Sequence, residues 1–169
     1  MEQDNYLYQV VGKTVKTIHL IDFEEELKSN DYSPWQVLIG FEEFDKFLNF
    51  EDAYDGDHIR IDLDASSIDD KLSTLTEPNL WKPYQPSLED LTDRLLGKEV
   101  TQIFYAKEKK EYVLNGEVFT GDQSLYSGLK IICDDDRLMI FSNGVGLSVE
   151  VNTDVEPYHK ETYDWFSIM

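Results

Sequence analysis

Two stretches of the sequence alternate strictly between apolar and polar residues, and each follows a dipeptide that favours a tight turn. Ile59–Leu63 comes after Asp55-Gly56, and Leu147–Val151 comes after Asn143-Gly144. Side chains on a strand point to opposite faces in turn, and Asp-Gly and Asn-Gly favour the type I′ turns of β-hairpins. The pattern therefore predicts, at both places, a hairpin that ends in a half-buried strand.

The two alternating strands belong to a longer internal repeat. Residues 11–18 read VGKTVKTI and residues 96–103 read LGKEVTQI, at an offset of 85 positions. Self-similarity of this kind indicates a duplicated unit. Upstream of each block, three apolar residues at the spacing i, i+4, i+5 predict one face of a helix. These residues are Tyr6, Val10 and Val11 in the first copy and Leu91, Leu95 and Leu96 in the second.

Gly12 and Gly97 hold the same place in the two copies, between the expected helix and a strand. A glycine after a helix commonly adopts the left-handed conformation, because it has no Cβ to clash with the backbone. We therefore expect a positive φ at both glycines.

The expected fold class is α+β, with two diverged tandem repeats, each a helix followed by an antiparallel β-meander, that share a core. Residues 1–82 form the first repeat and residues 83–169 the second. The two are expected to form one compact unit, because each alone is near the size at which a core is marginal. A short helix capped by Ser67, a hairpin at Asn115-Gly116 and a docked aromatic C-terminal segment are also expected. The expected strands are 14–21, 36–41, 47–50, 58–63, 100–106, 112–119, 129–133, 137–141 and 146–151.

Cys133 is the single cysteine, so the chain can form neither an internal disulfide nor a cysteine-based zinc cluster. It follows two isoleucines and has no basic neighbour, which predicts a buried, unreactive thiol. The N-terminus lacks the basic and apolar segments of a signal peptide. The longest strongly apolar run, Val37–Phe41, is far shorter than the roughly 20 residues of a membrane span. These features predict a cytoplasmic protein.

The sequence contains no motif that specifies a reaction. It has no phosphate-binding or dinucleotide-binding glycine loop and no nucleophile elbow. His19, His58 and His159 lie in separate segments without the spacing of metal ligands. A calcium loop over Glu51–Asp62 is disfavoured, because Ala53 stands where an oxygen ligand is needed and the loop ends in Asp rather than Glu. We therefore expect no enzyme activity, no catalytic residues, no cofactor and no metal site.

Charge is the strongest feature of the composition. The chain has 35 acidic and 15 basic residues, for a formal net charge of −20. Most of such a surface disfavours nucleic acid phosphates and anionic membranes. A single acidic run is explained by a solvated surface, but solubility needs a charge of only about 2–8 in a small domain. The excess indicates a basic protein partner. The candidate partner-binding residues lie at expected turns and strand ends: Glu24, Glu25, Glu26, Glu42, Glu43, Asp45, Asp52, Asp55, Asp57, Asp134, Asp135 and Asp136.

In its size, acidity and lack of catalytic motifs, the chain resembles the acidic immunity proteins of bacterial polymorphic and contact-delivered toxin systems. The resemblance implies a protein that neutralises a cognate toxin, often a basic nuclease, by stoichiometric binding through acidic surfaces. The resemblance rests on no sequence motif, so it assigns no site residue. The alternatives are a DNA-mimic inhibitor, a structural or interaction module without an inhibitory role, and an enzyme that uses a carboxylate pair between the repeats. DNA mimicry is less favoured, because the acidic residues cluster at turns rather than along helices.

Overall fold

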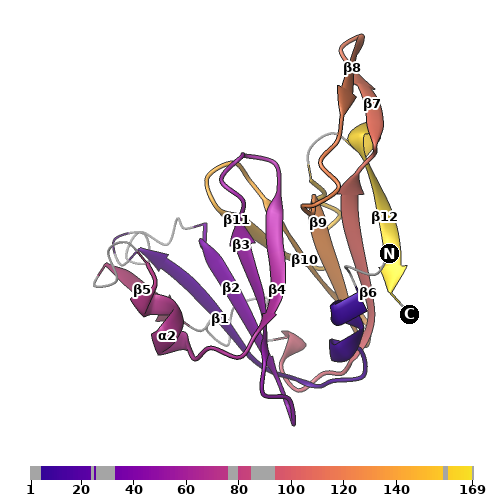
Figure 1. Ribbon diagram of the computed structural model, residues 1–169. Coiled ribbons are helices and arrows are strands. Elements are labelled where there is room, and N and C mark those ends of the chain that lie inside the picture. Colours follow the sequence, from indigo (N-terminus) through magenta and orange to yellow (C-terminus); the bar gives the residue numbers. More distant parts are fainter. Residues whose placement is uncertain are drawn as a thin grey trace.

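The computed structural model describes residues 5–23, 25, 33–75, 80–84, 94–157 and 160–168. Within these ranges the chain forms two five-stranded antiparallel sheets and a separate two-stranded hairpin (Figure 1). The strand order is β4-β3-β2-β1-β5 in the first sheet and β11-β10-β9-β6-β12 in the second. The two sheets therefore have the same connectivity, with β1 and β6 in equivalent places.

The first sheet consists of β1 (Val15–Phe23), β2 (Gln36–Phe41), β3 (Phe47–Asp52), β4 (Ile59–Asp64) and β5 (Trp81–Tyr84). The second consists of β6 (Val100–Glu108), β9 (Gly128–Cys133), β10 (Asp136–Ser142), β11 (Leu147–Val151) and β12 (Tyr163–Ile168). The separate hairpin consists of β7 (Glu111–Leu114) and β8 (Glu117–Thr120). The described helical elements are the 3-10 helices η1 (Asn5–Val10) and η3 (Lys160–Thr162) and the α-helix α2 (Ile68–Ser73).

The strands expected from the sequence are present, including the hairpin around Asn115-Gly116. Two further strands, β5 and β12, were not predicted as strands. Each pairs with the first strand of its repeat, β1 or β6. The C-terminal segment thus docks, as expected, and does so as the edge strand β12. The expected division of the chain after residue 82 falls within β5.

The prediction of an α+β fold in which a helix opens each repeat is wrong, because the molecule is mostly antiparallel β-sheet. Residues 5–10 form a 3-10 helix. The part of the second expected helix that precedes Arg94 lies outside the described residues, and Arg94 and Leu95 near its end have 3-10 conformation. Leu7 and Val10 are fully buried, and their spacing of three fits the three residues per turn of a 3-10 helix. A segment this short does not repay the nucleation of an α-helix, so packing decides its form. The predicted helix after Ser67 is confirmed as α2, with its capping box.

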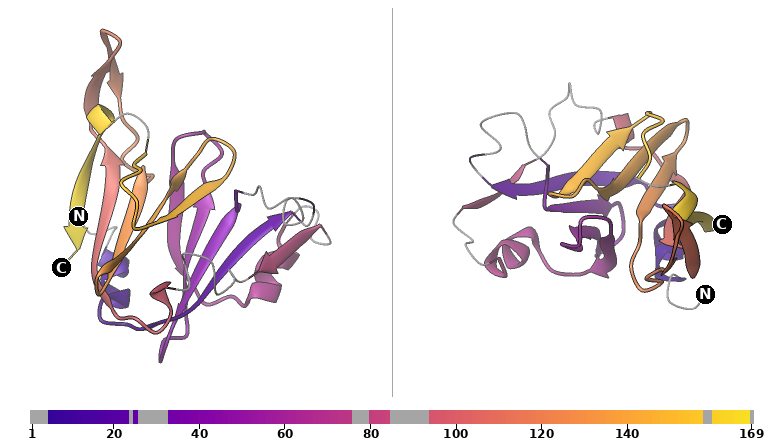
Figure 2. Two further views of the ribbon diagram at one scale, coloured as in Figure 1. Left: turned by 180° about the vertical axis from the view of Figure 1, so that it is seen from behind. Right: turned by 90° about the horizontal axis from the view of Figure 1, so that it is seen from above.

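The two sheets share one hydrophobic core. Its buried residues come from both sheets and from η1, and include Ile18, Ile39, Ile103 and Ile131. The equivalent strands β1 and β6 have identical patterns of buried and exposed positions, and each is irregular one residue after its start. Figure 2 shows the two sheets as separate layers from behind and from above. A second, smaller cluster of Ile21, Leu38 and Trp81 belongs to the first sheet alone.

The repeats exchange backbone hydrogen bonds where β1 and β6 begin. The Gly12 N–H donates to the Val100 carbonyl at 2.7 Å, and the Gly97 N–H donates to the Val15 carbonyl at 2.8 Å. Each bond maps onto the other when residues 85 positions apart are interchanged, so the contact has local two-fold symmetry. We call residues 12–15 and 97–100 the clasp. Both of its glycines have the predicted positive φ, 80° at Gly12 and 77° at Gly97.

Candidate functional site

Five of the predicted acidic residues lie exposed in two equivalent turns. Glu42, Glu43 and Asp45 belong to the turn between β2 and β3, and Asp134 and Asp135 to the turn between β9 and β10. Because the two sheets have the same topology, these turns occupy the same place in each repeat. We call them the acidic turns.

Both acidic turns are attached to the clasp. The Glu42 N–H donates to the Thr14 carbonyl at 2.9 Å on one side. On the other side, the Lys98 ammonium pairs with Asp136, the first residue of β10. The hydrogen bond from Lys98 lowers the pKa of Asp136, with a second contribution from Asn152. Asp136 therefore anchors its turn rather than presenting a free carboxylate.

Asp52 is not available to a partner, because its side chain is buried and used within the fold. Asp52 is 4% exposed, and its carboxylate accepts a hydrogen bond from the Ser142 hydroxyl at 2.7 Å. It also accepts one from the Tyr54 N–H at 2.6 Å. Ser142 ends β10, so this hydrogen bond joins the first repeat to the second. Sequence position alone gave Asp52 the appearance of a surface residue at a strand end.

The remaining predicted acidic residues do not join the acidic turns. Asp55 and Asp57 are exposed in the turn between β3 and β4, at the opposite end of β3 from Glu42 and Glu43. Glu25 is exposed, and Glu24 and Glu26 lie outside the described residues. The predicted set is thus distributed over more than one surface.

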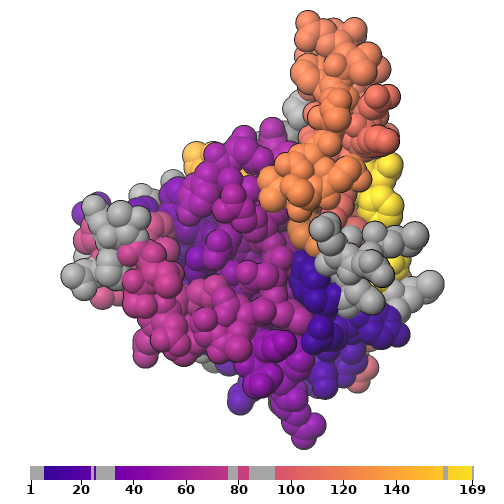
Figure 3. All heavy atoms as spheres, viewed as in Figure 1, coloured from indigo at the N-terminus to yellow at the C-terminus, as the bar shows by residue number. Residues whose placement is uncertain are grey.

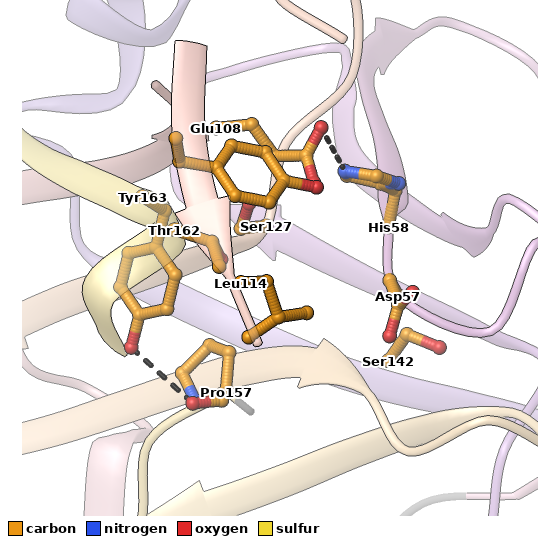
Figure 4. A pocket seen from close by; sticks show the side chains of 10 residues that line it. Asp57, His58, Glu108, Leu114, Ser127, Ser142, Pro157, Thr162 and Tyr163 are labelled. Carbon is orange, nitrogen blue, oxygen red and sulfur yellow. Dashed lines mark hydrogen bonds and ion pairs between the residues drawn. The ribbon is translucent and has the colours of Figure 1, made fainter. Parts of the chain in front are cut away.

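A pocket of about 120 Å³ lies where the β3–β4 turn of the first repeat meets the second repeat (Figure 4). Carboxylates of Asp57 and Glu108 line it, and none of its ten lining residues is Lys or Arg. Hydroxyl groups make up much of the remaining polar wall. The lining residues are Asp57, His58, Glu108, Tyr112, Leu114, Ser127, Ser142, Pro157, Thr162 and Tyr163.

His58 is held between two carboxylates in this pocket. Its Nδ1 lies 2.6 Å from Asp55 Oδ2. Burial opposes ionisation of Asp55, but hydrogen bonds from the Asp57 N–H and from the ring and N–H of His58 lower its pKa overall. An ionised Asp55 can only accept, so Nδ1 carries the hydrogen and donates it. The other ring nitrogen, Nε2, is buried without a hydrogen bond and lies 3.5 Å from Glu108 Oε2 (Figure 4).

Glu108 connects this pocket to the base of the β7–β8 hairpin. Its Oε1 accepts a hydrogen bond from the Tyr112 hydroxyl at 3.1 Å, and its Oε2 accepts one from the Asp122 N–H at 2.7 Å. Burial and the hydrogen bond to Glu108 raise the pKa of Tyr112. Burial and the charge of Glu156 likewise raise the pKa of Tyr163. Both phenols therefore stay protonated at neutral pH, and Glu108 acts as an acceptor.

The β7–β8 hairpin projects from the molecule and exposes apolar side chains (Figures 1 and 3). Val113 and Val118 form a cross-strand pair and are 58% and 72% exposed. Tyr112 and Phe119 form the neighbouring pair, with ring centroids 5.7 Å apart in a stacked arrangement. Exposed apolar surface on a projecting ribbon is typical of a contact with another macromolecule.

The described part of the chain offers no metal centre. Within it, no group of three or more His, Cys, Asp or Glu side chains is placed to hold an ion. The segment Glu51–Asp62, considered above as a calcium loop, forms the β3–β4 hairpin. His19 lies on β1, where burial lowers its pKa, and His159 lies outside the described residues.

The prediction of a buried thiol is confirmed. Cys133 is 1% exposed, and burial, with a further contribution from Asp134, raises its pKa to about 12. None of the helices in the described ranges has the length and apolar character needed to cross a bilayer.

Comparison with known proteins yields no match among protein-family models, curated proteins or solved structures. The interpretation of the site therefore depends on its geometry. Of the pocket residues, sequence reasoning had singled out His58 and Asp57. Glu108, Tyr112 and Ser142 come from β6, β7 and β10, and no spacing along the chain relates them.

Proposed function

We propose that this protein acts by stoichiometric binding of a basic partner protein, as an immunity protein neutralises its cognate toxin. A basic nuclease domain is the kind of toxin that such a surface would fit. The observation that carries the proposal is the pair of exposed acidic turns on a chain with a net charge of −20. Complementary charge speeds association and fixes the orientation of the partners.

The attachment of the acidic turns to the clasp supports this proposal. A backbone hydrogen bond from Glu42 and the side-chain pair of Lys98 with Asp136 link the two turns to the clasp, so Glu42, Glu43, Asp134 and Asp135 lie in or next to anchored positions. A partner then meets carboxylates whose positions are set before binding, which lowers the entropic cost of association. Because exposed charges are screened over about 8 Å at physiological salt, association should slow as salt is added.

The test begins with the genetic neighbourhood of the chain in its native host. A neighbouring reading frame for a toxin-like protein is co-expressed with this chain, and protection of the cells and formation of a one-to-one complex are measured. Association and dissociation rates are then followed over a series of salt concentrations. Lys substitutions at Glu42 and Glu43 should reduce the association rate more than they raise the dissociation rate.

The matched control replaces Glu42 and Glu43 by Gln, which removes the charge and keeps the shape. It should give an intermediate association rate, and both variants should unfold at the wild-type denaturant concentration because the side chains are exposed. An acidic partner, or an association rate indifferent to salt, would refute the electrostatic mechanism. Turnover of a small molecule that is lost when one carboxylate pair is replaced would refute a purely binding role.

A further inference from the structure

The pocket below the hairpin brings a buried ring nitrogen and a carboxylate oxygen close together without a hydrogen bond between them. His58 Nδ1 is held by Asp55, so Nε2 is the ring nitrogen that is left to face the pocket. That nitrogen is buried, makes no hydrogen bond, and lies 3.5 Å from Glu108 Oε2. Glu108 is itself an acceptor from Tyr112 and from the Asp122 N–H. Among the described residues, none donates a hydrogen bond to His58 Nε2 at this point of the pocket wall.

The described residues that line the pocket also bring no permanent positive charge. The Glu108 side chain is only 14% exposed, and Asp57 adds a second carboxylate to the wall. No lysine or arginine is among the residues that line it. Removing a carboxylate from water is costly unless a cation or several donors compensate it. The pocket is consequently suited to a ligand that brings both positive charge and N–H groups.

We propose that this pocket receives an arginine side chain of the basic partner, with the guanidinium group placed between Glu108 and Asp57. The proposal rests on the proposed function and names one of its contacts. A guanidinium has five N–H donors and can serve several acceptors at once, which a single ammonium does less well. A volume of about 120 Å³ exceeds the roughly 30 Å³ of one water and can hold such a group.

The hairpin provides the apolar surroundings that such an anchor needs. Tyr112 and Leu114 of β7 line the pocket, and Val113 and Val118 present exposed apolar surface on the same ribbon. Energetically important arginines at interfaces typically lie in a pocket that neighbouring contacts shield from water. The hairpin and the pocket at its base would therefore form one contact surface.

The probe for this proposal is N-acetyl-arginine methylamide, with the uncharged citrulline analogue as its matched control. Each is titrated into the full-length protein while backbone amide NMR signals are recorded. The arginine probe should give saturable shifts at Ser127, Thr162 and neighbouring pocket residues, and the citrulline analogue should not. Glu108→Gln should weaken binding of the arginine probe by about tenfold or more, as expected for the loss of a charged hydrogen-bond partner.

Two further variants make the test specific. Asp57→Asn removes the second pocket carboxylate at an exposed position and should weaken the probe severalfold without altering stability. Glu111→Gln removes the same charge from an exposed position of β7 outside the pocket lining and should bind like the wild type. If Glu108→Gln does not fold, the comparison of Asp57→Asn with Glu111→Gln decides the question.

The proposal is overturned if the two probes bind equally, if the shifts lie outside the pocket, or if no saturable shift occurs. A basic partner that binds wild type and Glu108→Gln equally also overturns the pocket contact but leaves the proposed function intact. If the pocket binds the arginine probe specifically but no basic partner protein exists, the proposed function is overturned and the arginine site of the pocket stands.

Discussion

The clasp glycines offer the sharpest test of the link between the repeated sequence and the fold. Gly97 has a φ of 77°, and its N–H donates to the Val15 carbonyl in the other repeat. A Cβ built at Gly97 would meet no atom within 4 Å. Any cost of substitution there therefore comes from backbone conformation and not from crowding.

The expected loss of stability can therefore be worked out from backbone conformation alone. A residue with a Cβ in the left-handed region costs roughly 1–2 kcal/mol, and a β-branched residue falls at the upper end. Replacing glycine also stiffens the unfolded chain, which returns about 0.4–1 kcal/mol. We expect Gly97→Ala to lower the free energy of unfolding by about 0.5 kcal/mol and Gly97→Val by about 1.5 kcal/mol. Gly97→Asn should cost less than either, because Asn tolerates this conformation.

Urea unfolding at equilibrium measures these differences. The same three substitutions at Gly12 provide an internal replicate, because Gly12 has a φ of 80° and also has no atom within 4 Å of a built Cβ. The order Val, Ala, Asn from most to least destabilising should hold at both positions. If Asn were as costly as Val, or Ala were neutral, the positive φ would not be what requires glycine in the clasp.

Three other predictions concern buried and paired groups. The hydrogen bond from Lys71 lowers the pKa of Asp64 to about 2 from 3.8. The ionised carboxylate therefore stabilises the fold above about pH 4, and this stabilisation is lost as the pH falls toward 2. Asp64→Asn should therefore lower the free energy of unfolding at neutral pH by about 1 kcal/mol, a value that allows for the partial exposure of the pair to water. In urea titrations, the difference from wild type should become small as the pH approaches 2. Asp52→Ala should lower the free energy of unfolding by about 2 kcal/mol or more, and a double-mutant cycle with Ser142→Ala should show coupling between the two residues. Additive effects would mean that their hydrogen bond does not stabilise the contact between the repeats. The thiol of Cys133 should react with a disulfide reagent only as fast as the protein unfolds, and rapid reaction of the folded protein would contradict its burial.

The error in fold class has a specific physical origin. The spacing of Tyr6, Val10 and Val11 suits one face of an α-helix, but a segment of six residues does not stabilise an α-helix by itself. Leu7 and Val10 instead enter the shared core from a 3-10 helix. The strands β5 and β12 escaped prediction as strands, because an edge strand needs only a partner to pair with and no strict alternation of its own.

The candidate site was only partly accessible from the sequence. Exposure of Glu42, Glu43 and Asp134 follows from their position in turns, which local sequence indicates well. The burial of Asp52 could not be foreseen, because it depends on Ser142, 90 positions away. The pocket around His58 and Glu108 has the same origin, since its walls belong to both repeats.

The sequence by itself determined the strands other than β5 and β12, the hairpin turns, the positive φ of the clasp glycines and the acidic character of the chain. Each of these depends on interactions within a few residues, or on composition: side-chain alternation, turn preference, the absence of a Cβ, and net charge. Only the tertiary structure decided which residues build the shared core, that η1 is a 3-10 helix, that Asp52 is internal, and that His58 faces Glu108. These features depend on which distant segments pack together. The alternation of apolar and polar residues within each repeat does not specify how the two repeats pack against each other.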